Sequence, residues 1–466
     1  MSKQLKPDQN LQSVGVISLG CSKNRVNTEQ MMFLLRQAGY LVSGETNDVD
    51  AVLLNTCGFI ESAKAEAVET ILELAAAKEE GRIRKLVVAG CLPQRYKEEI
   101  LEELPEIDAV IGTGSFDDVV SVIDGSRGTG FMLPSEEAQN LSPCFFGDIN
   151  APVSETPRII STSSLWAYLK IAEGCDNRCA YCCIPDIRGR FRSRPLENIV
   201  AEAEKLVDSG IRELILVAQD LTGYGFDLYG ERRLLELLVR LDGIKDLKWI
   251  RLHYLYPDGF DDELIDFIAK SGKILKYLDI PVQHINNRIL KKMNRRGTGN
   301  DIRELFKRIR ERVPGVVLRT SLITGLPGEG EKEFGELCDF LLEARIERVG
   351  VFAYSPESGT PAALMGRPPK AVAEKRAERL LDLQSGIMQE WNESRIGSVI
   401  TVLVEDFEIQ ENPETEEPGY FLARSYAESP DIDGYIFLQV RQEKNLFVDV
   451  RITGIENGNL VGTIIG

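Results

Sequence analysis

Short apolar runs alternate with helical stretches through the first 130 residues. The runs are rich in β-branched residues and lack polar alternation, which is typical of strands buried on both faces of a parallel sheet. Strands and helices that alternate in this way predict right-handed crossovers. The expected strands are residues 14–19, 51–55, 85–89 and 108–111, and the expected helices include residues 28–38 and 60–77.

A second series of strand–helix units runs from residue 163 to residue 360. Six units are too few for a closed eight-stranded barrel, so they predict an open, partial (βα)6 barrel with its active site at the carboxyl ends of the strands. The expected strands are residues 167–172, 213–218, 249–253, 277–282, 316–323 and 348–354. The expected helices include residues 196–209, 233–241, 262–269, 301–312 and 331–344.

The last hundred residues change from helical to strand patterning. Residues 368–396 are rich in alanine, glutamate, lysine, arginine and leucine, and they predict one long helix. Short strands between turn residues follow it and predict a small antiparallel β-barrel. These strands are expected at residues 399–403, 419–424, 435–440 and 446–450.

These patterns predict an α/β protein with three domains. A parallel α/β sandwich is expected over residues 13–130, a core with its long terminal helix over residues 163–393, and the barrel over residues 394–466. Residues 131–162 are expected to be a linker, because glycine, proline, serine and threonine are scattered through them.

The composition favours a cytoplasmic protein. No run approaches the ~18 apolar residues of a membrane span, and residues 1–12 lack an apolar signal core. We therefore expect reduced thiols and no membrane partner. The net charge of −18 suits a basic partner better than a phosphate backbone.

Three closely spaced cysteines follow the first strand of the second series. Cys175, Cys179 and Cys182 have the spacing C-x3-C-x2-C. A cubane iron–sulfur cluster normally takes four thiolates, so three thiolates leave one iron open to bind a small molecule. Zinc and a disulfide are alternatives, but zinc prefers four ligands and a disulfide is rare in the cytosol. Cys183 interrupts the spacing and is expected to be a buried apolar residue.

Each of the first three strands of the N-terminal domain also ends in a cysteine. Because the carboxyl ends of parallel strands line one crevice, Cys21, Cys57 and Cys91 are expected to meet there. Gly20 and Gly90 would allow close backbone approach. A single cysteine in this place is commonly just buried packing, but three equivalent ones predict a second three-thiolate cluster.

The loop around the three close cysteines has a further feature, the aromatic Tyr181 directly before the third one. The resulting pattern, C-x3-C-x-aromatic-C, resembles the radical S-adenosylmethionine (SAM) enzymes. The resemblance implies that the three cysteines are catalytic, since the open iron of a 4Fe–4S cluster in that family chelates SAM and one electron splits it to a 5′-deoxyadenosyl radical. It also implies SAM contacts from Tyr181, Gln219, Asp220, Arg319 and Gly325.

The blocks around the strand-end cysteines resemble the N-terminal domain of the methylthiotransferase family. In that family these cysteines hold an auxiliary 4Fe–4S cluster with one open iron. One departure is Asn27-Thr28, where an acidic residue and a serine are usual. The matching blocks are Gly20-Cys-Ser-Lys-Asn24, Asn55-Thr-Cys-Gly58 and Gly90-Cys-Leu-Pro93.

The terminal barrel resembles the TRAM domain, a substrate-recognition domain that often binds RNA. Residues 393–466 contain 14 acidic and 5 basic residues, so they hold half of the net charge of −18. A barrel of this charge would repel phosphate and attract a cationic protein surface. The blocks at residues 225–230 and 427–434 resemble the branch of the family that modifies ribosomal protein S-twelve.

The resemblance implies a transferase that adds a methylthio group to the β-carbon of an aspartate in that basic protein. A radical is needed because the C–H bond is unactivated. One cluster would cleave SAM, the auxiliary cluster would present sulfur, and a second SAM would supply the methyl group. An external one-electron reductant and a sulfur donor are the other expected partners, without stable binding of nucleic acid. The alternatives are the same chemistry on a tRNA adenosine and a non-catalytic iron–sulfur carrier.

Two basic tracts have no role that follows from the spacing alone. Alternation in the first tract would place its arginines on one face of an extended segment. That face could guard the site, anchor an acidic substrate side chain, or simply be a solvated edge. The second is expected to be a solvated helix end. The first tract holds Arg188, Arg190, Arg192 and Arg194, and the second holds Lys291, Lys292, Arg295 and Arg296.

Overall fold

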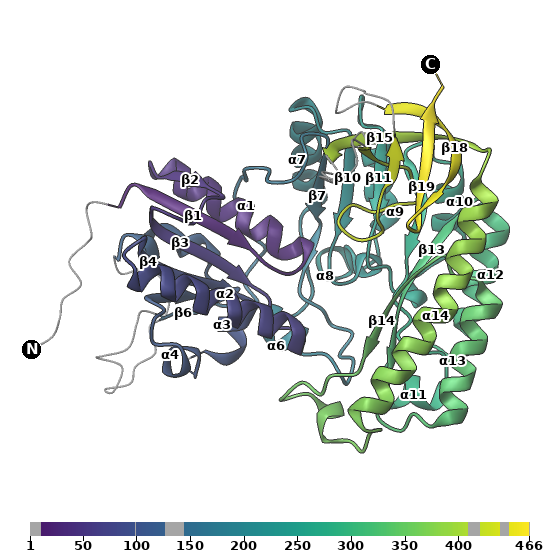
Figure 1. Ribbon diagram of the computed structural model, residues 1–466, viewed down its shortest axis with the longest axis horizontal. Helices are drawn as coiled ribbons and strands as arrows, with labels where there is room; N and C mark the ends of the chain where they lie inside the picture. Colours follow the sequence, from purple (N-terminus) through teal and green to yellow (C-terminus); the bar gives the residue numbers. More distant parts are fainter. Residues whose placement is uncertain (1–10, 98, 126–143, 409–419, 439–446, 466) are drawn as a thin grey trace, which may run out of the picture.

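The computed structural model describes residues 11–97, 99–125, 144–408, 420–438 and 447–465. It contains two large parallel sheets and a closed barrel, which confirms the expected fold class. In Figure 1 the first sheet (purple and blue) lies at one end of the molecule, and the barrel (yellow) lies against the core. Within the described ranges, no helix combines the length and the apolar composition that a membrane crossing requires.

The N-terminal sheet has the strand order β2-β1-β3-β4-β5-β6, with all pairs parallel. Its central strands are buried because α1 and α5 cover one face, while α2 and α4 cover the other. The strands are β1 (Ser13–Ser18), β2 (Leu41–Ser43), β3 (Val49–Thr56), β4 (Ile83–Gly90), β5 (Ala109–Ile111) and β6 (Cys144–Phe145). The helices are α1 (Ser22–Gln37), α2 (Glu61–Glu79), α3 (Cys91–Tyr96), α4 (Glu99–Glu103) and α5 (Val119–Ile123).

The two edge strands of this sheet were not expected from the sequence. β6 lies in the stretch expected to be a linker, where Cys144 pairs with Val110 of β5. β2 pairs with the start of β1 on the other edge. Each strand has only two or three residues, which is too short for periodicity to reveal it.

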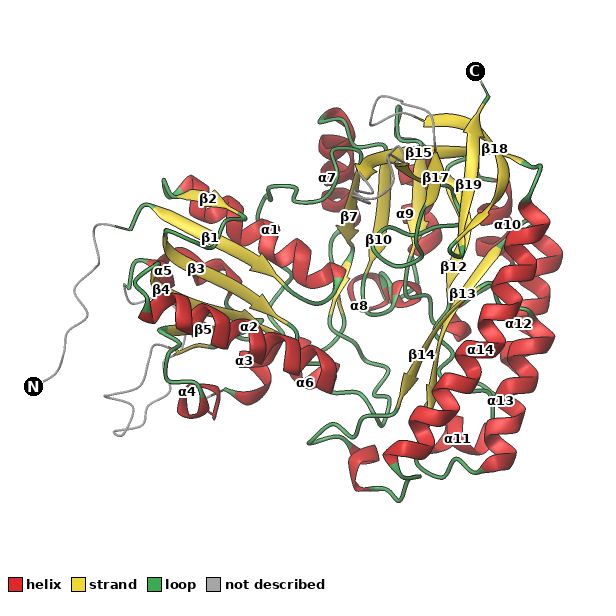
Figure 2. Ribbon diagram, viewed as in Figure 1, coloured by secondary structure: helices red, strands yellow, loops and turns green. Residues whose placement is uncertain are grey.

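The core sheet has the order β14-β13-β12-β11-β10-β7 and does not close, as expected for a partial barrel. Figure 2 shows its helices packed on the outer side of the strands, where one continuous apolar core forms. The strands are β7 (Trp166–Lys170), β10 (Glu213–Val217), β11 (Trp249–Leu252), β12 (Ile274–Asp279), β13 (Val317–Thr324) and β14 (Arg348–Ala353). The main helices are α7 (Leu196–Asp208), α9 (Leu234–Asp242), α10 (Asp262–Lys270), α12 (Gly299–Arg312), α13 (Glu331–Ala344) and α14 (Lys370–Arg395).

The terminal barrel closes in the order β15-β16-β17-β19-β18. Neighbouring strands in its described part are antiparallel except for β17 and β19, which pair in parallel. A closed ring with an odd number of strands cannot alternate direction throughout, which explains this departure from the expected antiparallel barrel. The strands are β15 (Val399–Glu408), β16 (Tyr420–Arg424), β17 (Ile436–Leu438), β18 (Phe447–Glu456) and β19 (Asn459–Ile464), the last not expected from the sequence.

The connection between β16 and β17, residues 425–435, docks the barrel onto the core, and we call it the docking loop. Arg251 of β11 donates hydrogen bonds to the carbonyls of residues 425 and 426. The Ser429 hydroxyl lies 3.0 Å from Nε2 of His253, and the Tyr277 hydroxyl donates to Asp433 at 2.5 Å. Much of the block at residues 427–434, expected to mark substrate choice, is therefore turned toward the core.

A buried ion network reinforces this contact. Arg424, at the end of β16, pairs with Glu213 of β10 at 2.8 Å and with Glu405 of β15. Glu213 also pairs with Arg251 at 2.8 Å. The side chains of Arg424, Glu213 and Arg251 are fully buried. Removing one partner from such a network leaves an uncompensated buried charge.

We predict that Arg424→Met destabilises the protein by about 3 kcal/mol, because Glu213 and Glu405 each lose a buried cationic partner. The measurement is urea denaturation followed by circular dichroism, with proteolysis to detect release of the barrel. Arg451→Met is the matched control, since Arg451 is an exposed arginine of β18. A variant at residue 424 that unfolds like this control would contradict the role of the network.

Candidate active site

The three strand-end cysteines lie at one edge of the N-terminal sheet. Cys21 directly precedes α1, Cys57 directly follows β3, and Cys91 is the first residue of α3 after β4. Gly20 has a φ of +87°, and a Cβ atom on it would lie 2.7 Å from Cβ of Cys57. Glycine is therefore required where the ends of β1 and β3 approach each other.

The electrostatics of these three thiols favour a shared positive partner. Burial, with the Cys91 thiolate beside it, raises the pKa of Cys57 to about 12. Burial also raises the pKa of Cys91. The pKa of Cys21 is lowered, because Lys23 and Arg188 together outweigh the burial that would raise it. Iron would relieve the repulsion among the three thiolates, since a coordinating metal stabilises the deprotonated form.

The second set of cysteines lies on the loop after β7 and β8 (Ala172–Glu173), at the carboxyl end of the core sheet. The backbone N–H of Cys175 donates to the Gly189 carbonyl at 3.1 Å, and that of Cys182 donates to the Cys179 carbonyl at 3.0 Å. Burial raises the pKa of Cys175 to about 11 and raises that of Cys182 well above its usual value. Cys183 is buried against Cys91, as expected for an apolar residue.

Tyr181 and Arg295 flank this loop. Arg295 donates to the Tyr181 hydroxyl at 3.1 Å and to Sγ of Cys179 at 3.6 Å. The interpretation of Arg295 as part of a solvated helix end is therefore wrong, because its guanidinium is buried beside a candidate ligand. No sequence pattern indicates this role, since the arginine follows α11 (Asn287–Lys292) within an otherwise ordinary basic run.

Gln219 and Asp220, both expected to contact SAM, form hydrogen bonds with the segment that carries the core cysteines. Gln219 Nε2 donates to Glu173 at 2.8 Å, and Asp220 accepts from the Asn177 side chain at 2.8 Å. Oε1 of Gln219 is buried and has no hydrogen-bond partner among the residues that the structure describes. An orphaned buried acceptor at the carboxyl end of a barrel strand fits a site that a polar ligand completes.

Gly325 and Arg319 lie in different surroundings. Gly325, with a φ of +75°, lines the same cavity as Tyr181, and a Cβ atom on it would lie 2.3 Å from Cβ of Ala373. Arg319 lies nearer the start of β13, where it donates to Asp279 at 2.8 Å and lies 4.0 Å from Asp433 of the docking loop. The structure therefore brings Tyr181, Gln219, Asp220 and Gly325 to the cysteine end of the barrel, while contact between Arg319 and SAM stays a prediction.

The arginines of the first basic tract do not share one face. Arg188 ends α6 (Ile184–Arg188) and is buried beside Cys91. Arg190 is exposed, Arg192 donates to backbone carbonyls, and Arg194 is buried in ion pairs with Glu155 and Glu202. The expectation of one extended face is wrong because the chain is helical up to Arg188 and turns at Gly189, which has a φ of +75°.

Each set of three thiols offers the number of ligands that a 4Fe–4S cluster with one open iron would take. Among the described residues, no three histidine, cysteine, aspartate or glutamate side chains are close enough together to hold one metal ion. All six cysteines lie in the described part of the chain, and none of them forms a disulfide.

A cavity of about 1300 Å³ opens between the two α/β domains. Its walls come from residues 59–65 of the N-terminal domain, the ends of β13 and β14, and residues 365–373 before and at the start of α14. Tyr181 and Gly325 contribute to the same walls. The cavity is thus continuous with the cysteine loop of the core.

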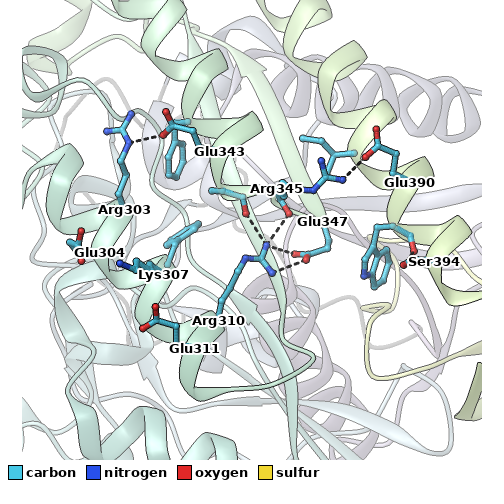
Figure 3. A pocket seen from close by; sticks show the side chains of 15 residues that line it. Arg303, Glu304, Lys307, Arg310, Glu311, Glu343, Arg345, Glu347, Glu390 and Ser394 are labelled. Carbon is cyan, nitrogen blue, oxygen red and sulfur yellow. Dashed lines mark hydrogen bonds and ion pairs between the residues drawn. The ribbon is translucent and has the colours of Figure 1, made fainter.

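A second pocket, of about 690 Å³, lies on the outer helices away from the cysteines (Figure 3). Its charged side chains largely satisfy one another, as in the pairs Arg303–Glu343 and Arg345–Glu390. Arg310 likewise pairs with Glu347 at 2.9 Å. This pocket therefore presents paired charges rather than reactive groups.

Three family models match successive parts of the chain. The chain matches Uncharacterized protein family UPF0004 over residues 13–112, the Radical SAM superfamily over residues 169–341 and the TRAM domain over residues 396–465. Among solved structures, the radical S-adenosylmethionine methyltransferase TsrM from Kitasatospora setae has a TM-score of 0.57 and 17% identity, over 76% of this chain and 77% of that one. The cobalamin-dependent radical enzyme OxsB has a TM-score of 0.53 and 15% identity, over 82% and 56%. These two similarities concern the fold alone.

Sequence relatives are much more similar and span the whole chain. The ribosomal protein uS12 methylthiotransferase RimO of Acetivibrio thermocellus is 45% identical over 97% of this chain and 98% of that protein. The protein of the same name from Heliobacterium modesticaldum is 46% identical over 97% and 95%. The chain therefore belongs to the ribosomal protein uS12 methylthiotransferase family of radical SAM enzymes.

Proposed function

We propose that this chain adds a methylthio group to the β-carbon of an aspartate in ribosomal protein uS12. One short segment, residues 188–189, hydrogen bonds to a cysteine of each set, and this contact carries the proposal because it would hold the two proposed cluster sites near each other. The cluster that cleaves SAM would be held by Cys175, Cys179 and Cys182. The auxiliary cluster would be held by Cys21, Cys57 and Cys91.

When bound, the two 4Fe–4S clusters and SAM supply reductive cleavage of SAM to a radical, hydrogen abstraction from the aspartate, and transfer of sulfur and a methyl group. The residues of the chain hold and orient these groups. Gln219 and Asp220 fix the cysteine loop through Glu173 and Asn177. Tyr181 and Gly325 would line the SAM side of the cavity, with Arg319 as a more remote contact.

The large interdomain cavity supports a protein substrate. A side chain on the surface of a folded protein must extend into the site to reach both clusters, and the cavity of about 1300 Å³ leaves room for it beside SAM. Glu61 and Lys370 are exposed charged residues in its wall.

The acidic charge of the terminal barrel supports a basic partner less strongly than its composition indicates. Glu428 pairs with Arg395 at 2.8 Å and with Arg348 at 3.2 Å, so its charge is used within the chain. Asp431 is exposed and contributes to the outer field. The partners we propose are uS12 in the cytoplasm, an external one-electron reductant and a sulfur donor, without stable binding of nucleic acid.

The direct test uses protein reconstituted anoxically with iron and sulfide, then supplied with SAM, dithionite and uS12. We expect mass spectrometry to find one methylthio group added to an aspartate of uS12, together with 5′-deoxyadenosine. The Cys175→Ala variant should yield neither product. Modification of a tRNA adenosine in a parallel reaction would overturn the proposal that the substrate is a protein. Reversible reduction without formation of 5′-deoxyadenosine would indicate a non-catalytic iron–sulfur carrier.

Iron analysis tests the two sites separately. We predict that Cys57→Ala lowers the iron content from about eight to about four atoms per chain, because one of two four-iron clusters is lost. This variant should still produce 5′-deoxyadenosine but no methylthio product. Cys338→Ala is the control, since Cys338 is buried in α13 and belongs to neither set. Full iron content in the Cys57 variant would remove that residue from the proposed ligands.

A further inference from the structure

A side chain of the radical SAM core completes the cysteine site of the N-terminal domain. Arg188 is buried, and its Nη2 donates to Sγ of Cys91 at 3.3 Å. Nη1 donates to Oδ1 of Asn27 at 2.9 Å, and Nη2 also donates to Asn24. Three residues of the N-terminal domain therefore share one guanidinium from the neighbouring domain.

The other side of this guanidinium faces the cysteine loop of the core. Nη1 of Arg188 lies 3.1 Å from Oε2 of Glu173, two residues before Cys175. Glu173 also accepts from Lys170 at 3.1 Å and from Gln219 at 2.8 Å. Gly189, the residue after Arg188, accepts a hydrogen bond at its carbonyl from the backbone N–H of Cys175. Arg188 and Gly189 thus link the Cys91 thiol to Glu173 and to the backbone of Cys175.

The charge around Arg188 is not fully neutralised. Among the described residues, Glu173 is the carboxylate that pairs with Arg188, and Lys170 shares that carboxylate. Asn24 and Asn27 are neutral acceptors. Lys23 adds a second positive charge near Cys21. A net positive charge beside a thiolate ligand favours the reduced, more negative form of a cluster, so it raises the reduction potential.

We propose that Arg188 is a positioning residue that raises the reduction potential of the auxiliary cluster and links it electrostatically to the cysteine loop of the core. The inference rests on the proposed function, because it requires a cluster on Cys21, Cys57 and Cys91. The negative charge of Glu173 opposes the effect of Arg188 on the reduction potential. The amide of Asn27 is neutral and does not oppose that effect. The potential therefore depends on residues from both domains.

The test measures the auxiliary cluster alone, in the full chain with Cys175, Cys179 and Cys182 all replaced by alanine. A redox titration followed by electron paramagnetic resonance gives the potential. We expect Asn27→Asp to shift it to more negative values, because an anion replaces a neutral acceptor of the same shape. Glu173→Gln should shift it to more positive values. Arg188→Met should give a negative shift, and Arg188→Lys should keep most of the original value.

Arg194→Met is the matched control, because Arg194 is a buried arginine of the same tract that pairs with Glu155 and, within the described part of the chain, contacts no sulfur. The auxiliary cluster of this variant should have the same reduction potential as that of the parent, in which only Cys175, Cys179 and Cys182 are replaced. Shifts of the reduction potential in opposite directions in Asn27→Asp and Glu173→Gln support the proposal. These two variants remain a valid test even when Arg188→Met fails to hold iron. Unchanged potentials, or shifts of the same sign, overturn it. A parent protein that binds no iron would instead overturn the proposed function.

Discussion

Parallel pairing in a fixed register is the constraint on which the candidate site depends. Ser18 of β1 lies beside Asn55 of β3, and Asn55 lies beside Ala89 of β4, so the three strands end at one level. Residues that are far apart in the chain therefore present their thiols at one edge. The core sheet obeys the same rule, and its cysteine loop follows the carboxyl end of β7. The contact through residues 188–189 is possible because these two edges face each other.

Much of this arrangement could be predicted from the sequence, because it follows from local signals. Buried parallel strands have a recognisable apolar pattern, and a cysteine after each such strand can be placed without knowing any contact. The roles of Arg188 and Arg295 could not be predicted. A long side chain can turn toward solvent or toward a thiol, and only the position of the neighbouring domain or loop decides between them.

Charge composition was the least reliable guide to the terminal barrel. A count treats every carboxylate as available to a partner, but Glu405, Glu428 and Asp433 bind groups of the chain itself. Burial of ionised groups is costly unless each has a partner, so the acidic barrel and the arginines of the core compensate each other. The exposed carboxylates that remain are a better measure of the field that an approaching protein meets.

The docking loop has a consequence for the evolution and engineering of this architecture. An accessory barrel is commonly regarded as a module that can be exchanged between enzymes. Here Glu213 and Arg251 belong to the core, yet their full set of partners includes Arg424 and the docking loop. A chimera that takes its barrel from another branch would have to transfer both halves of this contact together, so core and barrel are constrained to evolve as one unit.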